Sequence, residues 1–219
     1  MRFNYNDVDN YGNSSNSSFF TLKDDGDTAR VRIMYNGIDD VEGLAVHKIQ
    51  LGDKERYVNC IREYNDPIDM CPLCKANYKV IPKLFVPLYD EDTGETKIWE
   101  RGKKFFGKMS DLCNRYDNLV SHVFEIVRHG KPKDTQTTYE IWPIGNPDST
   151  TMEDLPDAPQ VLGSGIVLDK TAEELDYYLR YGEFPENSGT APREDNMAQR
   201  RPASSQQPAR RTPARGDAF

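Results

Sequence analysis

The sequence predicts a mainly β fold with a few helices and a disordered C-terminal tail. Three observations support this fold class. Short stretches in which apolar and polar residues alternate dominate the chain up to Gly145, and a period of two is typical of half-buried strands. A helical stripe interrupts them before the last two stretches. From residue 187 onward, Pro, Gln, Ser, Ala and Arg dominate, a composition that cannot bury enough apolar surface to offset the entropy of ordering.

The strands are expected in order along the chain. In residues 28–35, one face carries Val31, Ile33 and Tyr35, and the other carries Arg30, Arg32 and Met34. Six more strand-like stretches follow at residues 43–51, 56–60, 83–89, 96–101, 122–128 and 137–144. The turn sequence DEDTGE separates the fourth stretch from the fifth. Pro87 cannot donate a ladder hydrogen bond, so we expect the fourth strand to be an edge strand or to carry a bulge there.

Two longer helices and one short helix are expected. In residues 103–116, six residues recur at helical spacing on one face: Phe105, Phe106, Met109, Leu112, Cys113 and Tyr116. A second helix begins at Thr171, where TAEE forms a capping box, and ends at Gly182. Short, evenly spaced strands with a helix before the last two are typical of a small barrel of the OB type, and we predict this topology.

The length of 219 residues allows one well-packed domain with appendages. We predict a flexible segment at 1–18, a barrel core at 19–145, an acidic helical extension at 146–186 and a disordered tail rich in Arg, Pro and Gln at 187–219. The N-terminus lacks the basic-then-apolar order of a secretory signal, and no apolar run approaches the roughly 18 residues of a membrane span. An intracellular location is therefore expected.

One His and three of the four cysteines have the spacing of metal ligands. His47 and Cys60 have twelve residues between them, Cys60 and Cys71 have ten, and Cys71 and Cys74 have two. Zinc prefers four tetrahedral N or S ligands, and a two-residue gap lets both thiolates reach one ion. Pro72 suits the first position of a short helix. The set is closed, so we predict one structural zinc ion in a lobe around residues 47–80.

Other interpretations of these cysteines stay open. CPLC could be a thiol-disulfide motif, but such motifs normally follow the first strand of a βαβ unit, whereas this one lies among strands. Unrelated core thiols are the other alternative. Cys113 belongs to the apolar helical stripe and is expected to be a buried thiol.

A cluster of basic and aromatic residues surrounds one predicted hairpin. On residues 96–101, alternation puts Lys97, Trp99 and Arg101 on one face, and an aromatic ring between two cations suits single-stranded nucleic acid. Trp99 could instead cap the core. The full candidate set for nucleic-acid contacts is Arg30, Arg32, Lys83, Phe85, Tyr89, Lys97, Trp99, Arg101, Lys103 and Lys104.

Local charge is compatible with this interpretation although the formal net charge is -8. Residues 75–108 hold eight Lys and Arg against five Asp and Glu, whereas residues 148–186 hold two against ten. Phosphate binding needs only a local basic surface. We hypothesise that the acidic stretch competes with DNA for that surface, and a solvated acidic helix is the alternative.

A His, a Cys and a Cys-Pro-x-Cys at this spacing, followed by a strand hairpin and RGKKFF, resemble the single-stranded DNA-binding (helix-destabilising) proteins of tailed phages related to the T-even group. The resemblance covers roughly residues 47–109. It implies an OB fold with a zinc lobe that coats single strands in phage DNA replication, recombination and repair. It also implies that Tyr89, Trp99 and the Lys103 and Lys104 pair lie at or near DNA-contacting positions. The chain departs from the family in its N-terminal segment, where Arg2 is the sole cation, and in its Arg-rich tail.

The expected function is therefore non-enzymatic binding of single-stranded DNA with little sequence preference. Replication or recombination proteins are the expected protein partners, and they would bind through the C-terminal region. Binding to a membrane is not expected. The expected location is the cytoplasm of the infected bacterial host. The alternatives are a single-stranded RNA-binding protein and a metal-dependent nuclease with a structural zinc. No Walker loop, nucleophile motif or open metal set supports catalysis.

Overall fold

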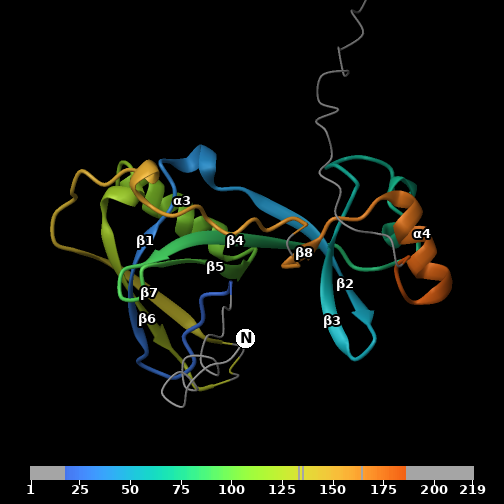
Figure 1. Cartoon of the computed structure of the whole chain (residues 1–219), viewed down its shortest axis with the longest axis horizontal. Helices are drawn as coiled ribbons and strands as arrows, with labels where there is room; N and C mark the ends of the chain where they lie inside the picture. Colours follow the sequence, from blue (N-terminus) through green and yellow to red (C-terminus); the bar gives the residue numbers. More distant parts are fainter. Residues whose placement is uncertain (1–17, 133, 135, 164, 186–219) are drawn as a thin grey trace, which may run out of the picture. The chain divides into compact units, whose positions relative to one another are not determined.

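The computed structural model describes residues 18–132, 134, 136–163 and 165–185, and within them the predicted mainly β fold with few helices is confirmed. The strands are β1 (Thr28–Ile33), β2 (Gly43–Leu51), β3 (Lys54–Asn59), β4 (Ile81–Asp90), β5 (Glu95–Gly102), β6 (Val123–His129), β7 (Thr138–Ile144) and β8 (Val167–Leu168) (Figure 1). The predicted flexible N-terminal segment and C-terminal tail lie almost wholly outside the described residues.

The described helices are α2 (Pro72–Lys75), α3 (Phe105–Arg115) and α4 (Ala172–Tyr181), with short 3-10 turns η2 (Ile38–Asp40), η3 (Ile68–Met70), η4 (Leu119–Ser121) and η5 (Met152–Asp154). The Thr171 side chain accepts a hydrogen bond from the Glu174 backbone N–H, and Gly182 ends α4 with a positive φ of 77°. The predicted capping box and glycine stop therefore define this helix. Among the described residues, no helix is long and apolar enough to cross a membrane.

All eight described strands belong to one sheet, in the order β7-β6-β1-β4-β2-β3-β8, with β5 paired to β4 outside this path. Every pairing is antiparallel except that of β3 with β8. β4 is the branch point. One of its edges pairs with β5, and the other pairs first with β2 and then with β1. Over the described strands, the sheet does not close into a hydrogen-bonded ring.

Pro87 lies at this branch, which corrects the expectation of an edge strand or a bulge. Ile98, opposite Pro87, directs its N–H and C=O away from β4 and bonds Ser18 and Phe20 instead. Pro87 therefore faces the other edge, where its carbonyl accepts from the Met34 N–H. Its missing N–H falls between the end of the β2 pairing and the start of the β1 pairing, so no ladder bond is lost.

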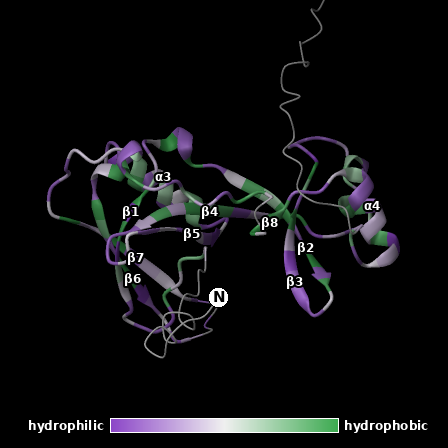
Figure 2. Ribbon diagram, in the orientation of Figure 1, coloured by the Kyte–Doolittle hydropathy of each residue, from purple (hydrophilic) through white to green (hydrophobic). Residues whose placement is uncertain are grey.

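The sheet is covered on both sides along β4 and β5. The inner side packs Val86, Leu88 and Trp99 against Met109 and Leu112 of α3. The outer side packs Phe85 and Ile98 under residues of the segment that follows β7. Figure 2 shows the corresponding mixture of hydrophobic and hydrophilic positions along the strands.

We call residues 146–168 the strap, because they link β7 to β8 across the outer side of the sheet. The Asp148 N–H donates to the Ser121 carbonyl at 2.9 Å, and the Thr96 hydroxyl donates to the Asp157 carbonyl at 2.8 Å. Val161, Leu162, Ile166 and Val167 then pack with Phe85 and Ile98. Helical structure in the predicted acidic extension is confined, within its described part, to η5 and α4. The described residues all fall in one compact unit.

Candidate metal centre and nucleic-acid interface

Two hairpin strands and one short helix bring the predicted ligands together. β2 and β3 pair His47 with Val58, and the Cys60 N–H continues the hairpin by donating to the Ala45 carbonyl at 2.9 Å. Cys71 is the N-cap of α2, and Cys74 lies within that helix after Pro72 at its first turn. The ligand atoms of His47, Cys60, Cys71 and Cys74 all lie within 4.8 Å of one another. These four side chains could hold a metal ion.

Three of the six distances between ligand atoms match those expected around a tetrahedral ion. Cys60 Sγ lies 3.6 Å from Cys74 Sγ, and His47 Nε2 lies 3.5 Å from Cys71 Sγ and 3.6 Å from Cys74 Sγ. A tetrahedron with metal–S bonds of about 2.3 Å and metal–N bonds of about 2.0 Å has edges of roughly 3.5 to 3.8 Å. The site therefore needs little rearrangement to close around an ion of this size.

The neutral imidazole of His47 suits a metal ion, whereas the thiol of Cys74 must release its proton to bind one. Burial, with added contributions from Cys60 and Cys71, raises the pKa of Cys74 to about 12, and burial lowers the pKa of His47. His47 Nδ1 lies 3.2 Å from the Lys79 carbonyl. A tautomer with the proton on Nδ1 donates this bond and leaves the Nε2 lone pair facing the thiols, the usual arrangement of a metal-bound histidine.

The lobe around these ligands is closed. His47 and Cys71 have no exposed surface, and α4 covers the site through Leu175 and Tyr178, which share a buried cluster with Leu73. Tyr178 also contacts β2 through a hydrogen bond, which its hydroxyl donates to the Gln50 carbonyl at 3.1 Å. No position remains open for a substrate among the four ligands, so the arrangement suits a structural metal.

Trp99 and Phe85 do not lie where base stacking requires them. Trp99 has no exposed surface and packs edge-on against Phe20, Phe105 and Tyr139, with ring centroids 4.8 to 5.8 Å apart. Phe85 is 6% exposed and lies beneath the strap. Both rings belong to the core in this structure, because each side of the β4 and β5 hairpin is covered. Tyr89 is half-buried, opposite Thr96.

Four of the predicted basic residues are paired with carboxylates. Arg30 lies 2.8 Å from Asp92, Lys83 lies 2.5 Å from Glu100, and Lys97 lies 3.2 Å from Asp90. Arg32 is buried and binds both Glu91 and Asp148, the latter at 2.7 Å. These pairs neutralise most of the charge that the sequence places on β1, β4 and the first half of β5.

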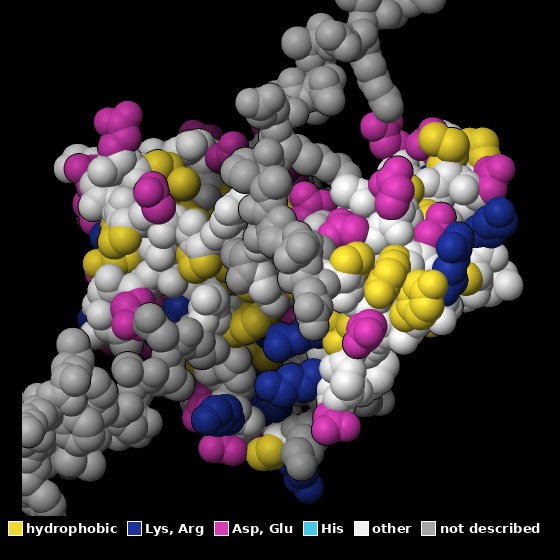
Figure 3. Space-filling view, turned by 45° about the vertical axis from the view of Figure 1, so that its right-hand side comes forward, with side chains coloured by type: hydrophobic (Ala, Val, Ile, Leu, Met, Phe, Trp, Pro, Cys, Tyr) yellow, Lys and Arg dark blue, Asp and Glu magenta, His cyan; other side chains and the backbone are white. Residues whose placement is uncertain are grey.

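Arg101, Lys103 and Lys104 come together in a different environment. A pocket of about 470 Å³, called here the basic pocket, forms where β5 ends, α3 begins and β7 begins. Its lining consists of Arg101, Gly102, Lys103, Lys104, Phe105, Lys108, Thr137, Thr138 and Tyr139. Four of the nine are cations and none is Asp or Glu. Figure 3 shows Lys and Arg side chains gathered in the lower middle of one face of the molecule, with Asp and Glu side chains beside them.

Two cations of the basic pocket, Arg101 and Lys108, have no carboxylate partner within the described part of the chain. The Arg101 guanidinium lies 4.3 Å from the Tyr139 ring and 4.5 Å from the Trp99 ring, and its buried Nε has no hydrogen-bond partner among the described residues. Burial lowers the pKa of Arg101 and the pKa of Lys108, whose ammonium donates to the Tyr139 carbonyl. An anion in the pocket would therefore stabilise both charges.

Lys108, Phe105 and Tyr139 line the basic pocket but are not in the predicted set of nucleic-acid contacts. Phe105 and Lys108 begin α3, and Tyr139 comes from β7, so the pocket joins segments that are distant in sequence. The available signal was the run RGKKFFGK, which holds four cations and no acid before Asp111.

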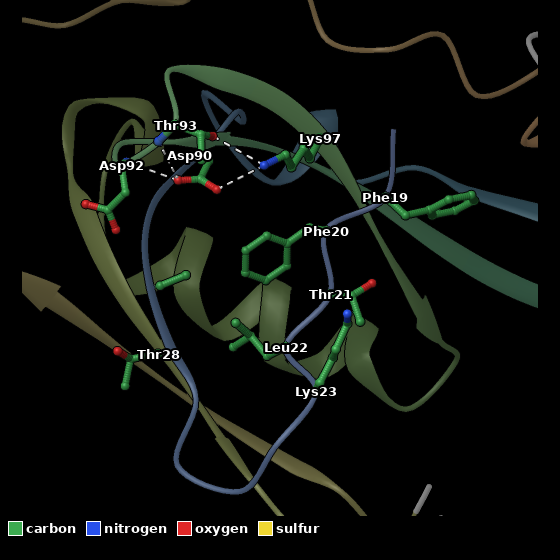
Figure 4. A pocket seen from close by; sticks show the side chains of 11 residues that line it. Phe19, Phe20, Thr21, Leu22, Lys23, Thr28, Asp90, Asp92, Thr93 and Lys97 are labelled. Atoms are coloured by element: carbon green, nitrogen blue, oxygen red, sulfur yellow. Dashed lines mark hydrogen bonds and ion pairs between the residues drawn. The ribbon is translucent and has the colours of Figure 1, made fainter. Parts of the chain in front are cut away.

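A second pocket, of about 490 Å³, contrasts with the basic one. Phe19 to Lys23 form one wall, and Asp90, Asp92 and Lys97 form the other. Figure 4 shows Asp90 held by Lys97 and by the turn that follows it. Because two carboxylates line this pocket, it does not suit phosphate.

Compared with known proteins, the chain matches no protein-family profile and no curated protein.

Proposed function

We propose that the protein binds single-stranded DNA with little sequence preference, through the basic pocket. The observation that supports this proposal most directly is the pocket lining, where four cations and two aromatic rings meet without a carboxylate. Single strands need this combination, because phosphates pair with cations while bases stack on rings, each base contributing about 1 to 3 kcal/mol.

Each pocket residue has a distinct role in this proposal. Lys103 and Lys104 are exposed and free to follow the phosphate backbone. Arg101 is held between aromatic rings, so it offers a preorganised guanidinium at the pocket floor. Phe105 and Tyr139 are half-buried, and the exposed part of each ring can contact a base. Stacking and phosphate contacts of this kind do not distinguish one base from another, so the proposed binding has little sequence preference.

We further propose that the metal centre binds one structural Zn²⁺ and that the protein is not an enzyme. The His-Cys₃ donor set and its spacing favour zinc over harder cations, which prefer oxygen. The ligand set leaves no open position for catalysis. The role of the zinc ion is to hold β2, β3 and α2 together beside β4, which pairs with β5, the strand that ends at the basic pocket.

The biological setting that we propose rests on the resemblance to phage single-strand binders. The protein would protect single strands during phage DNA replication, recombination and repair in the cytoplasm of the infected host. Replication or recombination proteins would bind through its C-terminal region.

The test is a titration of labelled oligo-dT followed by fluorescence anisotropy at several salt concentrations. Replacing Lys103 and Lys104 with Ala should weaken binding, and the slope of log K against log salt should fall by about 1.4, at about 0.7 per lost phosphate contact on a single strand. Replacing Lys75 and Lys79, exposed lysines of the metal lobe, is the matched control and should leave the slope unchanged.

Three results would contradict the proposal. The first is affinity that does not depend on salt, and the second is an equal loss in both double variants. The third is cleavage of the strand during incubation with magnesium, which would support the nuclease alternative. A matched oligo-U in competition decides between DNA and RNA, because tighter binding of oligo-U would replace DNA with RNA as the ligand.

A further inference from the structure

The metal lobe exposes an unusual amount of apolar surface. Of the eight large hydrophobic residues exposed in the described part of the chain, three lie in the loop of residues 61–70 between two metal ligands: Tyr64 (94%), Ile68 (62%) and Met70 (57%). Single exposed apolar side chains are normal, whereas a concentration of them marks an interaction site. This loop therefore needs an explanation beyond metal binding.

Packing at its ends and hydrogen bonds within it constrain the loop of residues 61–70. Its ends are continuous with the ligands Cys60 and Cys71, and η3 packs on α2. Between these ends, Arg62 donates to the Asp66 carbonyl at 3.0 Å, and the Glu63 N–H donates to the Asp66 carboxylate at 3.0 Å. Binding to a loop that is already ordered costs little conformational entropy.

The charge of the loop restricts what can bind it. Its charged residues are Glu63, Asp66, Asp69 and Arg62, and Arg62 is half-buried and donates a hydrogen bond to the loop backbone. The charge of the loop itself is thus mainly negative, opposite in sign to the basic pocket, while Lys75 at the end of the adjacent α2 is an exposed cation of the lobe. Nucleic acid and anionic membranes would be repelled, whereas a cationic protein surface would be attracted.

We propose that the loop of residues 61–70 docks a partner protein through a surface that is apolar at its centre and edged by Lys or Arg. Tyr64, Ile68 and Met70 fill the apolar centre, and the surrounding acids meet the cationic edge. The metal has a second task in this proposal, since it fixes both ends of the docking loop. The inference does not depend on DNA binding.

The test uses a defined probe, a labelled amphipathic helical peptide made of Leu and Lys, titrated with the full chain by fluorescence anisotropy. Replacing Tyr64 and Met70 with Ser should weaken binding by about tenfold or more, as expected for central apolar contacts. The matched control replaces Ile38 and Ile144, two exposed apolar residues outside the lobe, with Ser and should bind as wild type does.

Further arms separate this proposal from others. A peptide of Leu and Glu should not bind, and equal binding of the two peptides would overturn the charge argument. Equal affinity of the loop variant and wild type would overturn the docking site. Loop-dependent self-association in sedimentation, or loop-dependent binding to anionic vesicles, would overturn the choice of occupant. Oligo-dT affinity should be unchanged in the loop variant, so a failure of DNA binding remains distinguishable.

Discussion

Replacing Trp99 tests whether this residue stabilises the core or contacts nucleic acid. Trp99 is fully buried against three aromatic rings and the Arg101 guanidinium, and truncation of such a residue to Ala costs about 3 to 5 kcal/mol. In Trp99→Phe, the lost burial and cavity cost about 1 to 2 kcal/mol. Trp99 Nε1 is buried and has no hydrogen-bond partner among the residues that the structure describes, so its removal relieves a penalty of about 1 to 3 kcal/mol.

The expected order of stability is therefore clear. Trp99→Phe should stay within about 1 kcal/mol of wild type, whereas Trp99→Ala should lose about 3 to 5 kcal/mol. Urea unfolding followed by far-UV circular dichroism measures both. The control is Trp142→Phe, because Trp142 is 56% exposed and surface changes stay within about 0.5 kcal/mol.

Binding separates the two roles further. A stacking ring is worth about 1 to 3 kcal/mol per base, so loss of a true contact would weaken oligo-dT binding markedly. Trp99→Phe should instead leave the affinity within about threefold, since Trp99 does not reach the surface. A Trp99→Ala protein as stable as wild type, or a selective loss of affinity in Trp99→Phe, would refute the assignment of Trp99 to the core.

Two further predictions concern the metal lobe and the strap. Purified protein should contain near-stoichiometric zinc by elemental mass spectrometry. Chelation or Cys71→Ser should lower the midpoint of unfolding, because structural zinc contributes on the order of 10 kcal/mol in small zinc domains. An unchanged midpoint would reject the site. The Arg32 guanidinium holds the pKa of Asp148 well below its usual range, so the folded state binds fewer protons and loses this stabilisation as pH falls below about 4. Acid unfolding of Asp148→Asn should thus depend less on pH than that of wild type, while Asp53→Asn, in an exposed turn, should behave as wild type does.

Local signals predicted most of the elements. Residues 43–51 were expected as a strand and are β2, and the helix expected from Thr171 to Gly182 is α4. In both cases the determining chemistry, alternation or capping, lies within the element itself. The cluster of His47, Cys60, Cys71 and Cys74, which could hold a metal ion, was also predicted, because the spacing of these residues is a local property of the sequence.

The orientation of faces could not be predicted in the same way. Lys97, Trp99 and Arg101 do share one face of β5, but that face lies over the core, opposite Leu88, Val86 and Leu84 of β4. The strap covers the other face. Alternation assigns the residues of a strand to two faces, but it does not show whether one face or both faces are covered by other parts of the chain.

The packing of the strap against the sheet could not be predicted from a local sequence pattern. It contains one strand of two residues, β8, whose parallel pairing with β3 joins residues about 110 positions apart, such as Tyr57 and Val167. Two residues carry no periodicity, and the acidic composition around them suggested a solvated helix. The apolar residues that anchor the strap are separated by Pro, Gly and Ser, so no local pattern marks them as a packing surface.

The local balance of charged residues in the sequence indicates a phosphate-binding surface only where the cations have no carboxylate partners in the folded chain. Lys83 and Lys97 of this hairpin pair with Glu100, Asp90 and Glu95, and its other two acids, Glu91 and Asp92, pair with Arg32 and Arg30 of β1. The local excess of positive charge in this segment therefore overstates its attraction for phosphate. The balance changes where β5 ends, because the next acid after Glu100 is Asp111. Antiparallel pairing of β6 with β7 then brings Tyr139 beside this run of cations. The candidate interface therefore arises at a strand-to-helix junction, where unbalanced charge and a distant aromatic strand meet.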